Sequence, residues 1–353
     1  MRLLMLGGTE FVGRAVTEAA LARGWEVTVF HRGRHAAPPG TEVLLGDRTA
    51  EGGLAALTEG AGAGRGWDLV VDTWSKAPTA VRDTAGVLAG RVGRYVYVSS
   101  GSVYRYPSAA GHDESWPVVD ASPDDGDDVD YARAKRGGEL AALDAFGERA
   151  LLVRAGLILG PYENIGRLPW WLGRMARGGT VLAPGPRELA LQYVDVRDLA
   201  AWCLDAGAAG LGGPYNVISP SGHATMGELL VACARVTGGG ATLRWLDAGA
   251  VLAAGIEPWT ELPVWAAAGE LYDALHRTDV SRAVAAGLRC RPVEQTVVDT
   301  WRWLQGIGGV APHRPDRSRV GLDPAKEALA LRAAAGEGGA RAGQAQGQVQ
   351  RPG

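Results

Sequence analysis

The 353-residue sequence is poor in cysteine and has no long apolar run. Its cysteines, Cys203, Cys233 and Cys290, are widely separated and lack the spacing of metal ligands, so we expect them to be reduced core residues and expect no metal site. No apolar run approaches the roughly 20 residues that span a bilayer. The start, Met1-Arg2, leads directly into a short apolar run instead of a signal sequence, which predicts a cytoplasmic protein with no membrane partner.

The sequence also lacks a charge imbalance. Its net charge is −3, which provides no general basic field for nucleic acid. We therefore expect a small-molecule substrate and no nucleic-acid partner. The most acidic stretch, residues 106–129, has no structural period and is interpreted as a loop. Its aspartates, Asp124, Asp125, Asp127 and Asp128, fit a solvated face better than a metal site. With 46% hydrophobic and 21% charged residues, the chain can bury one large core or two modest ones.

The N-terminal residues predict a strand, a glycine turn and a helix. Residues 2–6 are apolar, Gly7, Gly8 and Gly13 follow, and residues 15–23 are rich in Ala. Glycines let a backbone approach a diphosphate, and the N-terminus of a helix attracts the same anion. The pattern is irregular because Glu10 occupies the place of the middle glycine. A tight turn without a ligand is the alternative.

The second predicted strand, residues 25–30, is followed by His31-Arg32-Gly33-Arg34-His35. An enzyme that prefers NAD usually has an acidic residue here, which accepts hydrogen bonds from the adenosine ribose. Two arginines instead favour the 2′-phosphate of NADP(H), with NAD(H) and a solvated basic turn as alternatives. The third strand, 43–45, leads to Asp47, which is placed to bind an adenine amino group, to cap a helix beginning near Glu51, or both.

Strands and helices continue to alternate through the first half of the chain. Strands are predicted at 67–72, 94–99 and 150–159, with helices at 78–88 and from Tyr131 to Leu143. This order is typical of an α/β protein with a doubly wound parallel sheet, in which ligands bind at the carboxyl ends of the strands.

Two groups of polar residues are predicted to meet at that edge. Ser99 and Ser100 end the fifth strand, and Tyr131 and Lys135 are separated by one helical turn, so they share a helix face. A nearby ammonium stabilises a phenolate, which lets a tyrosine exchange protons near neutrality, and a serine hydroxyl can orient a substrate oxygen. The set therefore predicts proton transfer at a carbonyl or an alcohol.

Taken together, these motifs resemble the extended or atypical short-chain dehydrogenases/reductases, the NAD-dependent epimerase/dehydratase family. The resemblance covers roughly residues 1–305 and rests on GGTEFVGR (7–14), GDR (46–48), SSGSVY (99–104), YARAK (131–135), VRAGLILGPYE (153–163) and QYVDVRDLA (192–200). It implies a Rossmann-type fold, catalytic assistance by Ser100, a general acid/base at Tyr131, and contact of Lys135 with the nicotinamide ribose. The predicted cofactor-binding residues are Gly7, Thr9, Glu10, Phe11, Val12, Gly13, His31, Arg32, Arg34, Asp47, Arg48, Thr73, Trp74 and Ser99.

The chain departs from the family pattern in three places. Gly101-Ser102 stands where sugar-nucleotide dehydratases have an acidic pair, which argues against dehydration because elimination needs an acid and a base. Ala155 replaces a frequent proline. The GGTxFxGR form of the loop resembles an atypical branch that includes reductases and RNA-binding proteins without catalysis, and retention of Ser100, Tyr131 and Lys135 favours chemistry.

Beyond the first half, the pattern becomes irregular. We expect a dinucleotide-binding core at 1–160, a smaller substrate-binding part at 161–332 with elements returning to the core, and a disordered tail at 333–353. A helix N-capped by Thr225 is predicted at 225–236, and the segment 255–265 is either a lid or a packed loop. Arg174 and Arg177 are expected at the surface. The candidate substrate residues are Tyr104, Asn164, Arg167, Trp171 and Gln192.

Three functions fit the sequence. The main prediction is an oxidoreductase that prefers NADP(H) and transfers hydride to or from a carbonyl or secondary alcohol, with Tyr131 as acid/base and secondary metabolism as one setting for the reaction. One alternative is a nucleotide-sugar epimerase that oxidises its substrate transiently. The other is a protein of the same fold that binds a nucleotide or RNA without catalysis. By resemblance only, the helices beginning near Pro78 and Tyr131 form a homodimer face.

Overall fold

The computed structural model describes residues 1–59, 62 and 64–344, and the chain divides into two units. The first comprises Met1–Asn164, Gln192–His223 and Ala268–Pro292; the second comprises Ile165–Leu191, Ala224–Ala267 and Val293–Gly353. The sequence pattern predicts a boundary near residue 160 and later elements that return to the core. Two later segments of the chain belong to the first unit.

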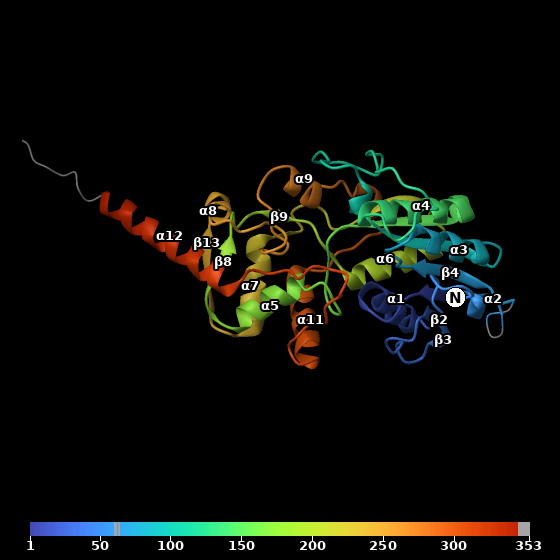
Figure 1. Cartoon of the computed structure of the whole chain (residues 1–353). Coiled ribbons are helices and arrows are strands. Elements are labelled where there is room, and N and C mark those ends of the chain that lie inside the picture. The colour runs from blue at the N-terminus through green and yellow to red at the C-terminus, as the bar shows by residue number, and fades with distance from the viewer. Residues whose placement is uncertain (60–61, 63, 345–353) are drawn as a thin grey trace, which may run out of the picture. The chain divides into compact units, whose positions relative to one another are not determined.

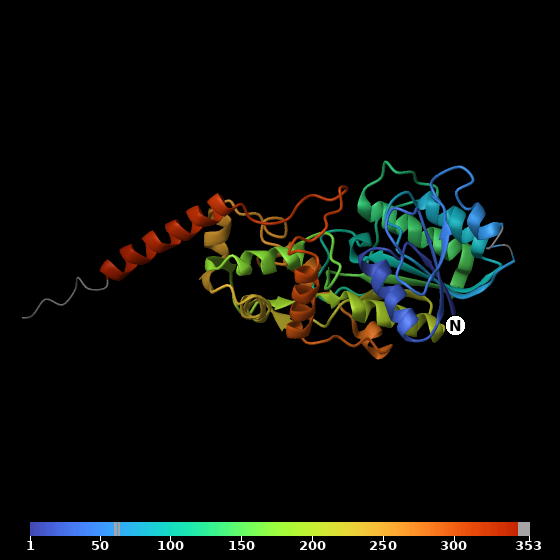
Figure 2. The ribbon, with the colours of Figure 1, turned by 90° about the horizontal axis from the view of Figure 1, so that it is seen from below.

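The first unit is built on a parallel sheet of seven strands in the order β11-β6-β5-β4-β1-β2-β3, as in Rossmann-type folds (Figures 1 and 2). The predicted doubly wound sheet is thus confirmed. The order reverses between β1 and β4, and such a reversal opens a crevice beyond the strands' carboxyl ends. The strands are β1 (Arg2–Leu6), β2 (Glu26–His31), β3 (Glu42–Leu45), β4 (Trp67–Asp72), β5 (Val92–Ser100), β6 (Ala150–Ala155) and β11 (Gly213–Val217).

Successive residues of β1 face opposite sides of the sheet, and helices cover both sides. Leu3 and Met5 pack in one cluster with α1 (Phe11–Ala22) and α6 (Val196–Ala208), whereas Leu4 and Leu6 pack in another with α3 (Pro78–Leu88) and α4 (Tyr131–Phe146). Because both faces are buried, the central strands are apolar throughout. The remaining elements of this unit are α2 (Ala55–Thr58), η2 (Gly101–Val103), η3 (Gly147–Arg149), β7 (Ile158–Leu159), β10 (Val194–Asp195), α9 (Glu270–His276) and α10 (Ser281–Ala285).

The predicted strand at 150–159 is interrupted. β6 ends at Ala155, and β7 pairs with β10 outside the large sheet. The break falls at Gly156, where a Cβ would lie 2.1 Å from Ile218 Cδ1, so only glycine permits this approach. The chain thereby leaves the large sheet just beyond the edge to which Ser100 belongs.

The second unit is smaller and mixed. Its strand pair β8–β13 is parallel, its pair β9–β12 is antiparallel, and α5 packs against α7 and α11. Thr225 caps α7 in a full capping box with Glu228, which confirms the predicted N-cap. The elements are α5 (Arg167–Ala176), β8 (Gly179–Pro184), β9 (Ala190–Leu191), β12 (Ala224–Thr225), α7 (Met226–Thr237), β13 (Ala241–Leu246), α8 (Ala248–Ala253), α11 (Val293–Gly306) and α12 (Pro324–Gln344).

The predicted disordered tail is wrong for residues 333–344, which belong to α12 (Figure 1). Alanine has the highest helix propensity, and α12 is fixed at its first turn by Glu327, which accepts hydrogen bonds from Arg174 and from Leu182 N. The helix therefore continues through the Ala-rich stretch despite its glycines. Residues 345–353 lie outside the described part of the chain. Among the residues described, no helix is long and apolar enough to cross a membrane.

Candidate functional site

The turn after β1 has the geometry of a phosphate-binding loop. Gly7 and Gly8 have φ angles of +113° and +85°, a conformation that glycine adopts without strain. A Cβ on Gly13 would lie 2.6 Å from Gly8 N, so the third glycine lets α1 approach the turn. These positions explain the observed glycines, and the residues fit a nucleotide diphosphate placed at the N-terminus of α1.

Glu10 tolerates the place of the middle glycine because its backbone is extended, with φ −136° and ψ 152°. It is the N-cap residue of α1, yet its side chain makes no capping hydrogen bond. Its carboxylate lies 3.8 Å from His35 Nε2, and both side chains are about half exposed. The basic side chain beside Glu10 is therefore His35, which follows the two arginines in the same loop.

The residues predicted for the adenosine end lie at the carboxyl ends of β2 and β3. Arg32 and Arg34 are exposed, and Asp47 accepts hydrogen bonds from Thr49 N and Oγ1 at 3.1 and 2.7 Å. These bonds lower the pKa of Asp47, and the two arginines lower it further although partial burial opposes the shift. Burial and the neighbouring His35 lower the pKa of His31. Two cations thus stand beside an ionised carboxylate at this corner.

Ser100 ends β5 and caps the short helix η2. Its Oγ accepts a hydrogen bond from Ser102 N at 3.1 Å and lies 3.1 Å from Ser102 Oγ. The side chain is half-buried, whereas Ser99 is buried and donates to Glu139 Oε1 at 2.8 Å. Of the two serines, Ser100 is the one at the sheet edge, and Ser99 faces inward.

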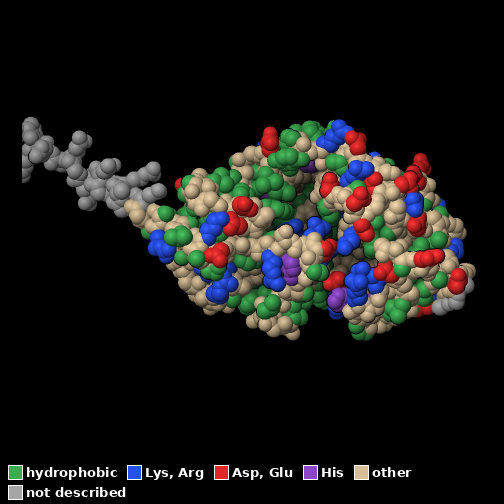
Figure 3. Space-filling model, viewed as in Figure 1, with side chains coloured by type: hydrophobic (Ala, Val, Ile, Leu, Met, Phe, Trp, Pro, Cys, Tyr) green, Lys and Arg blue, Asp and Glu red, His purple; other side chains and the backbone are tan. Residues whose placement is uncertain are grey.

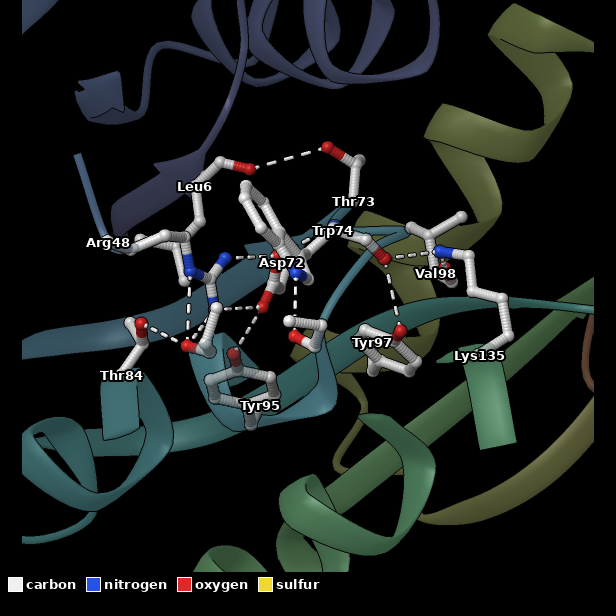
Figure 4. Close-up of polar contacts among 12 residues, drawn as sticks. Leu6, Arg48, Asp72, Thr73, Trp74, Thr84, Tyr95, Tyr97, Val98 and Lys135 are labelled. Carbon is white, nitrogen blue, oxygen red and sulfur yellow. Dashed lines mark hydrogen bonds and ion pairs between the residues drawn. The ribbon is translucent and has the colours of Figure 1, made fainter. Parts of the chain in front are cut away.

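Tyr131 and Lys135 lie in the first turns of α4, which packs against β5 and η2. Asp130 caps the helix by accepting a hydrogen bond from Arg133 N. Lys135 is buried, and its Nζ donates to Val98 O at 2.6 Å and to Trp74 O at 2.5 Å (Figure 4). Its ammonium also lies 4.9 Å from the centre of the Tyr97 ring. The helix thus places Lys135 at the carboxyl ends of β4 and β5.

Glycines allow this close packing of α4. A Cβ on Gly138 would lie 2.3 Å from Tyr97 Oη, and one on Gly137 would lie 2.5 Å from Ser122 O. The distance of Tyr131 and Lys135 from β5 therefore depends on two glycines that the sequence motif does not include.

The predicted residues at the ends of β1 and β4 also come together. Thr73 Oγ1 donates to Leu6 O at 3.3 Å, and Trp74 is half-buried with its Nε1 bonded to Ala77 O. Arg48 is different. Its guanidinium is buried and forms a bidentate pair with Asp72 at 2.8 and 2.9 Å, so its charge is paired inside the protein.

The predicted substrate residues are divided between the units. Tyr104, Asn164 and Gln192 belong to the first, and Arg167 and Trp171 belong to the second. Three of these side chains have structural partners. Tyr104 Oη donates to Asn216 Oδ1, Gln192 Nε2 donates to Ser219 O and Thr278 O, and Trp171 Nε1 donates to Pro263 O. We therefore leave Tyr104, Gln192 and Trp171 out of the candidate site.

Several other expectations are settled by partners inside one unit. Arg174, expected at the surface, is buried and paired with Glu327. Its guanidinium also donates hydrogen bonds to Gly178 O and Thr180 O, so its polar atoms have partners inside the protein. Asp195 pairs with Arg197 and accepts a hydrogen bond from Arg197 N as the cap of α6, and Asp198 pairs with Arg291. Segment 255–265 packs Leu262, Val264 and Trp265 in the interior, which favours a packed loop over a lid.

Two buried acidic residues next to the site are not predicted from the sequence. Asp72, the last residue of β4, and Glu139, on the same face of α4 as Lys135, are both fully buried. Each is bound by an arginine, Asp72 by Arg48 and Glu139 by Arg154. A carboxylate directly after the apolar residues 69–71 of β4 was the available signal for Asp72.

Comparisons with known proteins agree with this geometry. The model of the NAD dependent epimerase/dehydratase family matches residues 3–217. The solved structures similar to this chain include the UDP-glucose 4-epimerase of Thermus thermophilus in complex with NAD, at 23% identity and a TM-score of 0.57, covering 86% of this chain and 99% of that chain. They also include the UDP-glucuronic acid 4-epimerase of Bacillus cereus in complex with NAD, at 13% identity and a TM-score of 0.59, covering 87% and 99%.

A search of curated proteins finds no match. At these identities the solved structures show the fold alone, whereas the family match spans more than half of the chain and includes the glycine turn, Ser100, Tyr131 and Lys135. The chain belongs to the NAD-dependent epimerase/dehydratase family.

Proposed function

We propose that this protein is a nucleotide-sugar epimerase that oxidises a secondary alcohol transiently and reduces the resulting ketone on its other face. The single observation that carries the proposal is the placement of Tyr131, Lys135 and Ser100 at one sheet edge, beside a glycine turn shaped for a diphosphate. The similar solved structures include epimerases of UDP-sugars, which supports this reaction over net reduction.

The reaction needs one proton acceptor and one hydride acceptor. The glycine turn would hold a nicotinamide cofactor, which would supply the acceptor and later the donor of the hydride at the alcohol carbon. Tyr131, in its phenolate form, accepts the hydroxyl proton as the C–O bond becomes a carbonyl, and it gives the proton back when the carbonyl is reduced. No atom or electron is gained or lost over the cycle, so substrate and product are isomers.

The neighbouring residues orient this proton transfer. Lys135 is held at the ends of β4 and β5 by Trp74 O and Val98 O, which keeps a cation one turn of α4 from Tyr131. Ser100, fixed as the cap of η2, presents a hydroxyl at the end of β5 that can bond the reacting oxygen. A substrate oxygen between Ser100 and Tyr131 would be held in the geometry that proton transfer requires.

The proposal is tested with the full-length protein, NAD⁺ or NADP⁺, and a panel of UDP-hexoses deuterated at the carbon that carries the reacting hydroxyl. We expect a mixture of epimers that retains the deuterium, with no net change in nicotinamide absorbance. Loss of deuterium to the solvent would indicate proton abstraction from carbon. Stoichiometric consumption of reduced cofactor would indicate a reductase, and neither epimers nor absorbance change with any donor would sink the enzyme assignment.

Net reduction of a carbonyl by NADPH is the second candidate, because one observation favours the phosphorylated cofactor. Arg32 and Arg34 are exposed after β2, where an acidic residue would bind the ribose of NAD. Acidic and basic side chains are otherwise interspersed on the face shown in Figure 3. A local pair of guanidiniums therefore provides the electrostatic preference for a 2′-phosphate.

Replacing both Arg32 and Arg34 by Ala is expected to weaken NADPH binding by about tenfold to a hundredfold, since each charge-assisted hydrogen bond is worth about 1.5–3 kcal/mol before solvent screening. Binding of NADH should change little. Calorimetric titration of both cofactors measures the ratio, and Arg133→Ala, an exposed site on α4, is the matched control. Equal weakening of both cofactors would contradict a role in recognising the 2′-phosphate.

A further inference from the structure

The main chain of Trp74 joins two buried groups, one of which is Lys135. Trp74 N donates to Asp72 Oδ1 at 2.9 Å, and Trp74 O accepts hydrogen bonds from Tyr97 Oη at 3.0 Å and from Lys135 Nζ at 2.5 Å (Figure 4). The residue lies just beyond β4, where the strand has ended and no ladder holds the chain. The position of its carbonyl oxygen therefore depends on these side chains, and the position of the Lys135 ammonium depends on the carbonyl.

Asp72 is an ionised acceptor in the protein interior. It is 0% exposed and accepts hydrogen bonds from both terminal nitrogens of Arg48, from Tyr95 Oη at 2.6 Å and from Trp74 N. Burial alone would raise the pKa of Asp72, but the Arg48 guanidinium more than offsets this and holds the pKa below its usual value. The bond from Trp74 N is consequently charge-assisted and stronger than an ordinary amide bond.

Arg48 links this carboxylate to the surrounding elements. It donates to Ala80 O at 2.9 and 3.2 Å, in the first turn of α3, and its guanidinium lies 5.0 Å from the centre of the Trp74 ring. A buried ion pair often contributes little to stability, because the cost of desolvating both charges offsets their attraction. Asp72 also bonds Trp74 N, and Trp74 O is a hydrogen-bond acceptor of Lys135. The ion pair is therefore connected to Lys135 through a single residue.

We propose that Asp72, held by Arg48, and Tyr97 are positioning residues for Lys135, acting through the Trp74 peptide group. Asp72 accepts the hydrogen bond of Trp74 N, and Tyr97 donates one to Trp74 O. Trp74 O in turn holds the Lys135 ammonium, one helical turn from Tyr131 on α4. The inference rests on the proposed function for its consequence in turnover, because Lys135 matters there as the cation beside the acid/base. A displacement of about 1 Å in such a group can lower a rate by about a hundredfold.

Two variants perturb this link in different ways. Asp72→Asn keeps the shape of the side chain, but its NH₂ must face either Trp74 N and Arg48 Nη1, or Arg48 Nη2 and Tyr95 Oη, so a donor of Arg48 loses its acceptor in either orientation. Tyr97→Phe keeps the ring beneath Lys135 and removes only the hydroxyl that bonds Trp74 O. Thr84→Val is the matched control, since it removes a buried hydroxyl that donates to Ala80 O, which keeps its hydrogen bonds from Arg48, and it leaves the bonds of the Trp74 peptide group in place.

The chain offers a readout that requires no substrate, because it has only three lysines, Lys76, Lys135 and Lys326. Competitive acetylation followed by mass spectrometry gives the reactivity of Lys135 relative to exposed Lys76. We expect Tyr97→Phe and Asp72→Asn to raise that ratio by about tenfold, the order expected when one buried hydrogen bond is lost and the site opens locally. Thr84→Val should leave the ratio unchanged.

Hydrogen exchange and turnover complete the test. The amide of Trp74 should exchange faster in both variants, and kcat should fall by about tenfold or more with a displaced pH–rate profile. Should Asp72→Asn fail to fold, Tyr97→Phe alone decides. Wild-type reactivity of Lys135 in Tyr97→Phe, or an equal increase in Thr84→Val, would overturn the positioning role. Absence of turnover in the unmodified protein would count against the proposed function only, because the acetylation ratio still reports the link to Lys135.

Discussion

Tyr131→Phe is expected to lower kcat by about 10²–10⁴-fold, the range by which a positioned general acid/base accelerates a reaction. The substitution removes one oxygen atom at the first residue of α4 and leaves the helix cap at Asp130 intact. Phenylalanine can neither accept the hydroxyl proton nor return it, while the glycine turn and Lys135 remain in place. Cofactor binding, measured by calorimetric titration, should therefore be unchanged.

The effect is measured as the rate of epimer formation under saturating cofactor and substrate. Tyr106→Phe is the matched control, because Tyr106 is an exposed tyrosine of the same unit and should keep full activity. Retention of most of the turnover in Tyr131→Phe would assign the proton transfer to another group. A parallel loss of cofactor binding would instead show that Tyr131 supports the fold of the site.

Much of the first unit follows from local sequence, since its helices and strands alternate with clear boundaries. The strand predicted at 67–72 and the helix predicted at 78–88 have the observed ends, and α4 begins at Tyr131 as expected. Apolar runs between glycine turns specify buried parallel strands, and the crossover between parallel strands is usually a helix. Such patterns are contained in a few consecutive residues, which is why the sequence alone reveals them.

The partners of the polar residues are not predictable in the same way. Arg48 and Asp72 are 24 residues apart, and Arg174 and Glu327 are 153 apart. No local pattern states that two such side chains will meet. The sequence therefore suggests a cofactor residue at Arg48 and a surface residue at Arg174, because a charged side chain is usually solvated when its distant partner is unknown. The hydrogen-bond partners of the candidate substrate residues Tyr104 and Gln192, which are Asn216 and Ser219, are distant in the sequence as well.

Glu139→Gln is expected to lower the stability of the first unit by about 3–5 kcal/mol, the cost of removing one charge of a buried ion pair. Glu139 is 0% exposed and accepts hydrogen bonds from Arg154 Nε and Nη2 at 2.9 and 3.0 Å, from Ser99 Oγ and from Arg136 Nη1. Glutamine has the same shape, but its NH₂ faces donors, and the guanidinium of Arg154 keeps its charge in the interior.

Native-state hydrogen exchange of β5 and β6 measures this loss within the first unit. Glu42→Gln is the control, because Glu42 pairs with Arg65 at the surface and its loss should cost no more than about 1 kcal/mol. If the cost in Glu139→Gln arises from the uncompensated charge, Glu139→Leu combined with Arg154→Met should recover part of the stability, since apolar pairs of similar volume replace buried ion pairs well. A double variant as unstable as the sum of its single variants would show instead that the individual hydrogen bonds carry the energy, from Ser99 Oγ to Glu139 and from Arg154 Nη1 to Tyr104 Oη, so that the stability of α4 would depend on its contacts with the end of β5.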